Sequence, residues 1–374
     1  MLAWFLCDVA GTPERTVTYP RDQRRYQSGP DLVTGIHIGG TSITLPFVGQ
    51  SATLGRGDMC ELRDPREPAA VKYLSAAHAR IERVSVSGML RVSNISNGKN
   101  DIVVNGEIAH QEFYLGVGDW FMVGKTPYIA VNQEMQSARG DVMEILGIRS
   151  HTAIDALLIA AVRDSGRHML LIGESGSDQE RLARMVHQIS HRRHKRFYDL
   201  GPKAVLDADT RANLRDTEGG TVLVDVLKRG ALDQKLAAAL MHPDLALRLV
   251  IATYSPEKAL ASFSAPLVHG ATHIRIPPVC ERREEIAELL DKWFIGSRSA
   301  LRFPLLRPEL KTGLLSYDWP ENLKELRTTA HNLMQVAHYR SEREAAKNSE
   351  LSREQLRGWF RRLGITIKYP LIAE

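Results

Sequence analysis

An apolar run, a glycine-rich turn and a helical pattern follow one another in the middle of this sequence. The run is HMLLI at 168–172, the turn is GESGSDQE (Gly173–Glu180), and the helical pattern RLARMVHQI comes next. A strand, a glycine-rich turn and a helix in this order form a phosphate-binding loop, which ends in Gly-Lys-Ser/Thr. Here those last three places hold Asp178, Gln179 and Glu180. The pattern therefore predicts the shape of a phosphate site without the positive charge that phosphate needs.

Four further pieces with chemically active residues occur in order within the first third of the chain. LGRGDMCEL at 54–62 places an arginine in a turn, and LSAAHARI at 74–81 has a serine and a histidine three residues apart. GKNDIVVNG at 98–106 contains asparagine-bearing turns, and LGVGDWFMVG at 115–124 is a turn that leads into an apolar run. Short alternating runs surround them, and helical periodicity is hard to find. This pattern is typical of a β-sandwich.

These four pieces resemble the pattern of the forkhead-associated (FHA) domain, over roughly residues 30–135. The resemblance implies an all-β sandwich that binds a phosphothreonine protein, either a Ser/Thr kinase or its substrate. It implies that the phosphopeptide contacts Arg56, Ser75, Lys99 and Asn100. It also implies that the loops are shaped by Gly55, His78, Asn105 and Gly106. A phosphothreonine carries nearly two negative charges and three acceptor oxygens, which suit an arginine fork and a hydroxyl donor.

Two points leave alternatives open in this module. The residue after Ser75 is often basic in the FHA pattern but is Ala76 here, so we expect weaker phosphate binding, with Lys99 compensating. A shifted alignment puts Asn97 in the place of Asn100. The alternative to phosphate binding is an FHA fold in which Arg56 is a surface charge.

The composition is that of an ordinary globular protein with more than one domain. The chain has 374 residues, 43% of them hydrophobic and 25% charged, and a net charge of +5. At about 100–200 residues per domain, two or three domains are expected. Three dispersed cysteines predict neither a metal site nor a disulfide framework and suit a reducing cytoplasm. No stretch approaches the roughly 20 apolar residues of a membrane span, so we expect no membrane partner.

A polar stretch at 133–140 is typical of a linker. Strand and helix patterns alternate after residue 140, which predicts a parallel α/β sheet. EGGTVLVDVL (218–227), ALRLVIATYS (246–255), ERREEI (281–286) and YDWPENLKELR (317–327) follow the GESG turn. Together these motifs resemble the AAA+ domain of bacterial enhancer-binding proteins, the sigma-54 activators. The resemblance implies an α/β core followed by a helical lid. It places a nucleotide site at Gly173, Gly176, Gln179, Asp225 and Arg327, the last near the lid's sensor arginine.

The departures from this family pattern fall on the residues that carry its chemistry. Gln179 replaces the loop lysine, Val226 replaces the acidic residue after Asp225, and Tyr254 replaces a polar sensor. Phosphoryl transfer depends on positioning and charge neutralisation, so we expect a degenerate ATPase with no catalytic residue and no cofactor. Residual ATP binding is the less favoured alternative. In a purely structural role, Asp225 caps a strand or pairs with a neighbour. The family's GAFTGA segment is also absent, which removes its contact with sigma-54.

The last segment, EAAKNSELSREQLRGWFRRLGI at 344–365, resembles the end of the Fis-type helix-turn-helix of the same activators. Ser352 would cap a helix that carries basic residues toward a DNA major groove. The resemblance implies DNA contacts from Arg353, Arg357 and Arg361. Trp359 and Phe360 are expected to pack inward. The alternative is a basic helix that packs on the lid.

The sequence as a whole favours a non-catalytic signalling or transcription regulator of bacterial type. We expect an FHA domain at 1–135, a degenerate AAA+ core at 141–299, a lid at 300–340 and a helix-turn-helix-like segment at 341–374. The AAA+ part would be a scaffold or a surface for homo-oligomers. One alternative is an ATP-hydrolysing sigma-54-dependent activator. Another is a phospho-dependent interaction protein with no role at DNA.

Overall fold

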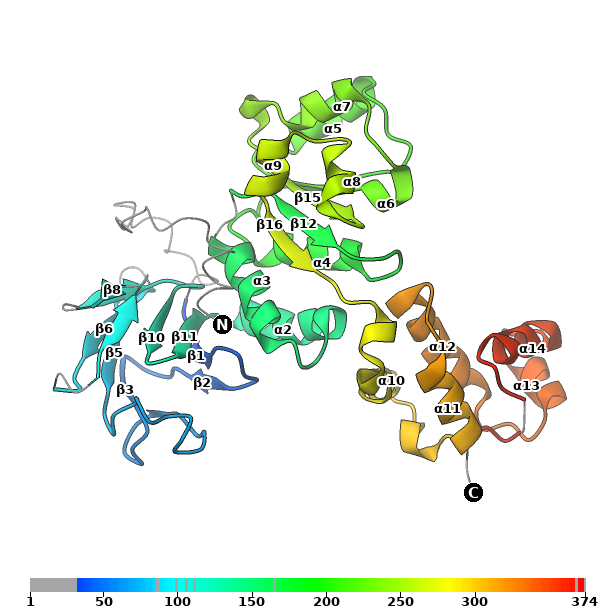
Figure 1. Ribbon diagram of the computed structural model, residues 1–374, viewed down its shortest axis with the longest axis horizontal. Helices are drawn as coiled ribbons and strands as arrows, with labels where there is room; N and C mark the ends of the chain where they lie inside the picture. The colour runs from blue at the N-terminus through cyan, green and yellow to red at the C-terminus, as the bar shows by residue number, and fades with distance from the viewer. Residues whose placement is uncertain are drawn as a thin grey trace.

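The chain folds into β-strands first, then alternating strands and helices, then helices alone (Figure 1). The computed structural model describes residues 32–84, 88–97, 100–104, 107–109, 112–163, 166–366 and 369–372. Lys99, Asn105 and Gly106 lie outside these described residues. The predicted multidomain fold class, with an all-β module, a parallel α/β domain, a helical lid and a short helical C-terminus, is confirmed. In the described ranges, no helix is both long and apolar enough to cross a membrane.

The first module is a sandwich of two mainly antiparallel sheets. One sheet has the order β2-β1-β11-β10-β7-β8 and the other has the order β4-β3-β5-β6-β9. Buried and exposed side chains alternate along strands such as β5 and β9, because successive residues of a strand point to opposite faces. The strands are β1 (Gly35–Ile38), β2 (Thr44–Pro46), β3 (Ser51–Gly55), β4 (Leu62–Arg63), β5 (Ala79–Arg83), β6 (Leu90–Asn94), β7 (Ile102–Val104), β8 (Glu107–Ile108), β9 (Phe113–Leu115), β10 (Trp120–Val123) and β11 (Thr126–Val131).

Helix α2 (Gln133–Leu146) begins directly after β11, with Asn132 as its N-cap. The sequence favoured a polar linker at 133–140, and this expectation is wrong. The segment is helical because Met135, Ala138, Val142 and Ile145 form one buried face at helical spacing. Helix α3 (His151–Arg163) follows, so the two helices lie between the sandwich and the rest of the chain (Figure 1).

The α/β domain has a five-stranded parallel sheet in the order β13-β14-β15-β12-β16. Its central strands are continuous apolar runs buried on both faces, as is usual in a parallel sheet covered by helices. The strands are β12 (Met169–Ile172), β13 (Phe197–Leu200), β14 (Thr221–Asp225), β15 (Arg248–Thr253) and β16 (Thr272–Arg275). The helices are α4 (Gln179–Ile189), α5 (Ala208–Asp216), α6 (Val226–Arg229), α7 (Gln234–Leu240), α8 (Pro256–Leu260) and α9 (Ala265–Gly270).

Helices alone make up the last part of the chain. The lid comprises α10 (Ile286–Gly296), α11 (Pro308–Ser316) and α12 (Asn322–Val336), and α13 (Glu342–Asn348) and α14 (Arg353–Arg362) follow. Short 3-10 turns lie at Pro243–Leu245, Val279–Glu281, Arg283–Glu285 and Phe303–Leu305. The chain end returns to the lid, since Ile372 bridges to Leu306 and Arg307 donates its backbone N–H to the Leu371 carbonyl.

A buried charge cluster joins the sandwich to α3. The Asp155 carboxylate accepts a hydrogen bond from the Gly40 backbone N–H at 2.7 Å and lies 3.2 Å from His37 Nε2. Arg139 of α2 pairs with the same carboxylate and also donates to the Thr41 carbonyl at 2.9 Å. His37 and Asp155 are nearly inaccessible to solvent. Because a buried charge is stable only when it is paired, this cluster fixes the sandwich against α2 and α3.

Candidate functional site

Three loops of the sandwich bring Arg56, Ser75 and Asn100 together at one edge. The Arg56 backbone N–H donates to the Ser75 carbonyl at 3.1 Å, and the Asn100 side-chain amide donates to Ser75 Oγ at 3.2 Å. The Asn100 carbonyl in turn accepts hydrogen bonds from Asn94 and Ser96. The side chain next to Ser75 is therefore that of Asn100, whereas the shifted alignment would require Asn97, which has a left-handed backbone with φ of 54°.

The turn that carries Arg56 is held rigidly against the Ser75 loop. A Cβ atom on Gly55 would lie 2.2 Å from the Ala76 carbonyl oxygen, so only glycine fits there. The Gly57 backbone N–H and the Cys60 thiol both donate to that same carbonyl, at 3.0 and 2.9 Å. Arg56 itself is exposed, and within the described part of the chain no carboxylate pairs with its guanidinium. The arrangement leaves one arginine fork available beside a hydroxyl and an amide.

His78 lies beneath this edge and is completely buried. Its Nδ1 accepts a hydrogen bond from the Ser75 backbone N–H at 3.2 Å, which ties the Ser75 loop to the sheet. Burial lowers the pKa of His78 from 6.5 to about 4. The imidazole is therefore neutral at physiological pH and acts as a fixed acceptor.

We expect His78 to make the sandwich less stable as the pH falls from about 6.5 to about 4.5. The unfolded chain takes up a proton on this histidine near pH 6.5, whereas the folded chain resists it until pH about 4. The loss should reach about 2.5 kcal/mol of unfolding free energy at pH 4.5. Urea unfolding of the chain and of His78→Asn, which keeps an acceptor but cannot be protonated, measures it. Equal pH slopes for the two chains would show that His78 does not titrate in this way.

The glycine-rich turn after β12 has the fold of a phosphate-binding loop but is filled by its own side chains. Gln179, at the lysine position, is buried and donates from Nε2 to the Glu174 carbonyl at 2.8 Å. A Cβ on Gly173 would lie 3.1 Å from Ile276. Gly176 has φ of 80°, and a Cβ there would lie 2.1 Å from the Glu321 carbonyl oxygen in the lid. The N-terminus of α12 in the lid therefore contacts the loop directly.

Acidic side chains form ion pairs with Arg327, which the sequence analysis placed near the lid's sensor arginine. Arg327 donates to the Asp178 carboxylate at 2.7 Å and to the Glu144 carboxylate at 2.7 Å. Glu144 is 3% exposed and also pairs with Arg181 at 2.7 Å and with Lys292 at 3.0 Å. Burial alone would raise the pKa of Glu144, but hydrogen bonds from these three cations outweigh it and lower the pKa to about 2.

Glu144, Arg181 and Lys292 were not found from the sequence. They lie on three different elements, α2, α4 and α10, and no motif contains them. Glu144 lies on the side of α2 opposite Met135 and Val142, and it is buried because α4, α10 and α12 cover the last turn of the helix. The sequence gives no signal for this burial, because the helix alone would leave Glu144 in solvent.

Asp225 takes the structural role that the sequence left open as an alternative. Its carboxylate caps α6 by accepting the Lys228 backbone N–H at 3.0 Å. It also lies 3.1 Å from the Lys228 ammonium, which is 3.8 Å from Glu180. Val226 is buried where the family has an acidic residue, and Tyr254 is 52% exposed. Lys228 thus supplies from within the chain a positive charge beside Asp225.

The C-terminal helix α14 is capped as expected, but its first two arginines form ion pairs within the chain. Ser352 and Gln355 form a capping box at the N-terminus of α14. Arg353 and Arg357 both donate to the Glu342 carboxylate of α13, at 2.8 and 3.1 Å. Arg361 is exposed, and Trp359 and Phe360 are buried, as the sequence indicated. The outer face of α14 therefore carries Arg361 together with an arginine pair that shares one carboxylate.

The α/β domain is similar in sequence to known bacterial regulators. The family model of the sigma-54 interaction domain matches residues 148–227. The C4-dicarboxylate transport transcriptional regulatory protein DctD of Pseudomonas aeruginosa is 28% identical over 204 residues, which cover 43% of this chain and 44% of DctD. The transcriptional regulator NtrC of Salmonella typhimurium is 26% identical over 255 residues, 58% of this chain and 50% of NtrC. The chain spans about half the length of these curated relatives.

Solved structures resemble the two parts of the chain separately. The structure of NtrX from Brucella abortus in complex with ATP is 19% identical, with a TM-score of 0.41. The match covers 54% of this chain and 55% of the NtrX chain. The FHA domain of CT664 from Chlamydia trachomatis is 14% identical, with a TM-score of 0.23. The match covers 26% of this chain and 95% of the CT664 domain.

The sandwich with its Arg56 and Ser75 edge, followed by the α/β domain with its glycine-rich loop and lid, defines an FHA plus AAA+ architecture. The AAA+ part is similar to that of the sigma-54 activators, and the match to the sigma-54 interaction domain covers residues 148–227.

Proposed function

We propose that this chain is a non-catalytic regulator that binds a phosphothreonine protein through its FHA edge and uses its AAA+ part as a scaffold. One contrast carries the proposal. Arg56 is exposed beside Ser75 and Asn100 with no carboxylate partner in the described residues, whereas Asp178, Asp225 and Arg327 of the nucleotide site all pair within the chain. A free arginine fork beside neutral donors is the arrangement that an incoming phosphate requires.

At the FHA edge, each side chain has a distinct role in the proposed binding. The Arg56 guanidinium would donate two charge-assisted hydrogen bonds to the phosphate. The Ser75 hydroxyl would donate a third, and the Asn100 amide, 3.2 Å from it, would hold the peptide backbone. The partner class is a Ser/Thr kinase or its substrate, because such a pair generates phosphothreonine.

In the AAA+ part, the side chains oppose ATP hydrolysis. The loop lacks the lysine that would neutralise the phosphates, and Gln179 instead closes the loop onto Glu174. Asp178 adds negative charge at the N-terminus of α4, where the helix dipole would otherwise favour an anion. The residue directly after Asp225 is Val226, which has no carboxylate, so the attacking water would have no general base or positioning group.

A phosphopeptide-library pull-down with the full chain tests the FHA part of the proposal. We expect retention of phosphothreonine peptides and no retention of the same sequences without phosphate. Phosphoserine versions should be retained less, which would identify the partner as a threonine-phosphorylated protein. A library from which no phosphorylated sequence is enriched would refute the proposal and leave an FHA fold without a phosphate function.

We also propose that the chain acts in the cytoplasm and contacts duplex DNA through the outer face of α14. Arg353, Arg357 and Arg361 would bind phosphates and base edges. Glu342 competes for the first two, since their Nε atoms lie 2.8 and 3.1 Å from its carboxylate. DNA must therefore displace this internal anion. Self-association of the scaffold would place several such helices on one duplex.

We expect Glu342→Gln to raise duplex affinity about tenfold at low salt, because it releases two arginines for phosphate contacts. Arg353→Glu combined with Arg357→Glu should abolish binding. Gel shifts over a salt series measure both effects. Glu354→Gln on α14 removes the same charge from a side chain that has no ion pair among the described residues, and it should raise the affinity less. If the parent chain shows no salt-sensitive binding, the chain is an interaction protein without a DNA role.

A further inference from the structure

Helix α2 is fastened to the FHA sandwich at the level of Arg139. It continues from β11 with only the N-cap Asn132 between them. Arg139 pairs with Asp155 of α3 and donates to the Thr41 carbonyl of the sandwich at 2.9 Å. Asp155 in turn accepts the Gly40 N–H of the sandwich. These contacts are buried and charge-assisted, so α2 cannot rotate relative to the sandwich without leaving a charge unpaired.

The last turn of α2 is fastened to three other elements through one carboxylate. Glu144 accepts from Arg181 of α4, Lys292 of α10 and Arg327 of α12, at 2.7 to 3.0 Å. Lys292 also donates to the Gly140 carbonyl of α2, and the Arg327 guanidinium lies 5.2 Å from the Trp293 ring centre. One buried anion therefore links the sandwich-borne helix to the loop helix and to the lid.

The lid is also joined to the glycine-rich loop by direct hydrogen bonds. Asn322 donates to the Glu174 carboxylate and the Ser175 carbonyl, both at 3.1 Å, and Lys324 N–H donates to the Gly176 carbonyl at 3.1 Å. Asp178 at the N-terminus of α4 faces Arg327. In many proteins a phosphate group binds at the N-terminus of a helix. Here Asp178 places a negative charge at that end, and its carboxylate pairs with Arg327 without capping the helix.

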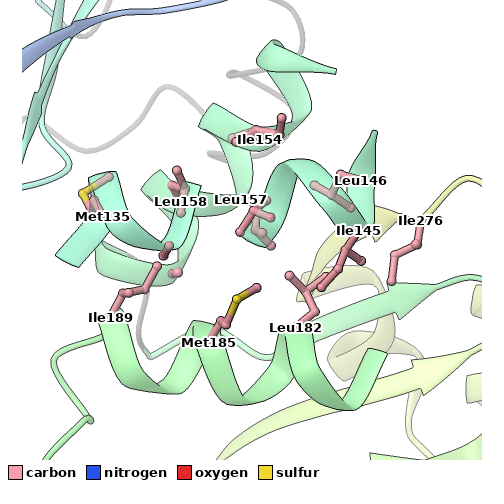
Figure 2. Close-up of a cluster of buried hydrophobic side chains, with 14 of the residues drawn as sticks. Met135, Ile145, Leu146, Ile154, Leu157, Leu158, Leu182, Met185, Ile189 and Ile276 are labelled. Carbon is pink, nitrogen blue, oxygen red and sulfur yellow. The ribbon is translucent and has the colours of Figure 1, made fainter. Parts of the chain in front are cut away.

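Apolar side chains of α2, α3 and α4 also pack together next to these polar contacts. Figure 2 shows side chains of α2, α3 and α4 pointing toward one another, among them Ile145 and Leu146 of α2, Leu157 of α3 and Leu182 of α4. Since these residues are almost fully buried, α2 is packed along its length as well as paired at Arg139 and Glu144.

We propose that α2 is a strut that holds the lid closed on the α/β domain through Glu144 and fixes it relative to the FHA sandwich, with no need for nucleotide. The strut goes beyond the proposed function, because it concerns the position of the lid and not what the FHA edge binds. Its consequence is that the helix pair α13–α14, which follows the lid, has one fixed position relative to the phosphopeptide edge.

Hydrogen exchange of the full chain, resolved to peptides, tests the strut. In Glu144→Gln and in Arg327→Gln, we expect the amides of α12 to exchange about tenfold faster than in the parent, because a charge-assisted link is removed. Glu134→Gln removes the same charge from the same helix, at a side chain that forms no ion pair within the described part of the chain, and it should leave α12 unchanged. Amides of the sandwich should keep the parent rates in all three variants. Arg327→Gln is the milder change, since the Arg327 side chain is 39% exposed.

The outcomes separate the strut from the proposed function. Unchanged exchange of α12 in both Glu144→Gln and Arg327→Gln would overturn the strut, and so would a gain in α12 protection when Mg-ATP is added to the parent. Binding of a phosphothreonine peptide by the same variants should match the parent. If peptide binding fails in the parent while α12 responds as expected, the proposed function falls and the strut stands.

Discussion

Replacing Arg56 by alanine is expected to weaken binding of a phosphothreonine peptide about 100-fold, or about 2.7 kcal/mol. The guanidinium is the one free charged fork at the FHA edge among the described residues, and the other donors there are a hydroxyl and an amide. Ala76 adds no cation next to Ser75, so the loss should be larger than in a site that has a basic residue at that position. Calorimetric titration with the best peptide from the library measures the change.

The matched control is Arg63→Ala, a nearby exposed arginine whose guanidinium already pairs with Asp58 at 2.9 Å. It removes the same charge from the sandwich and should change the affinity less than twofold, since exposed pairs contribute little. Equal losses for Arg56→Ala and Arg63→Ala would indicate general electrostatic attraction and not a defined phosphate site.

Gly176→Ala should lower the free energy of unfolding of the α/β domain and lid by about 3 kcal/mol. The residue has φ of 80°, and the added Cβ would lie 2.1 Å from the Glu321 carbonyl oxygen, a backbone atom that cannot move away alone. The lid must separate from the loop, which breaks the hydrogen bond from Lys324 N–H to the Gly176 carbonyl. Urea unfolding followed by tryptophan fluorescence reports the loss, because Trp319 is fully buried just before α12.

Gly364→Ala separates the two causes of this effect. Gly364 follows α14 with φ of 70°, and nothing lies within 4 Å of an added Cβ. It should therefore cost only the strain of a positive φ, about 1 kcal/mol. A Gly176→Ala loss no larger than that of Gly364→Ala would mean that the lid does not rest on the loop.

The sequence allowed the fold class to be predicted because local patterns determine it. Alternation around Ala79–Arg83 indicated strands, and the apolar runs before Gly173 and up to Asp225 indicated a parallel sheet. The error at 133–140 arose because the polar residues of α2 lie on its exposed face, and a short window shows them without the buried face. Packing against α3 and α4 makes this segment helical.

The internal charge pairing could not be predicted because it joins residues that are distant in sequence. Glu144 meets Arg327 and Lys292 only after the lid has folded onto the α/β domain. The substitutions at Asp178 and Gln179 indicated that a phosphate would be opposed, but not that Arg327 and Glu174 would bind these residues instead. The pairing of Arg353 and Arg357 with Glu342 was likewise outside any motif.

Release of inorganic phosphate from Mg-ATP by the purified full chain tests most directly whether the AAA+ part is a scaffold. We predict a rate equal to that of the buffer blank, both for the parent and for Asp225→Ala, because Asp225 is paired with Lys228 and the next residue, Val226, has no carboxylate. Steady release that is well above the blank and is lost in Asp225→Ala would contradict it.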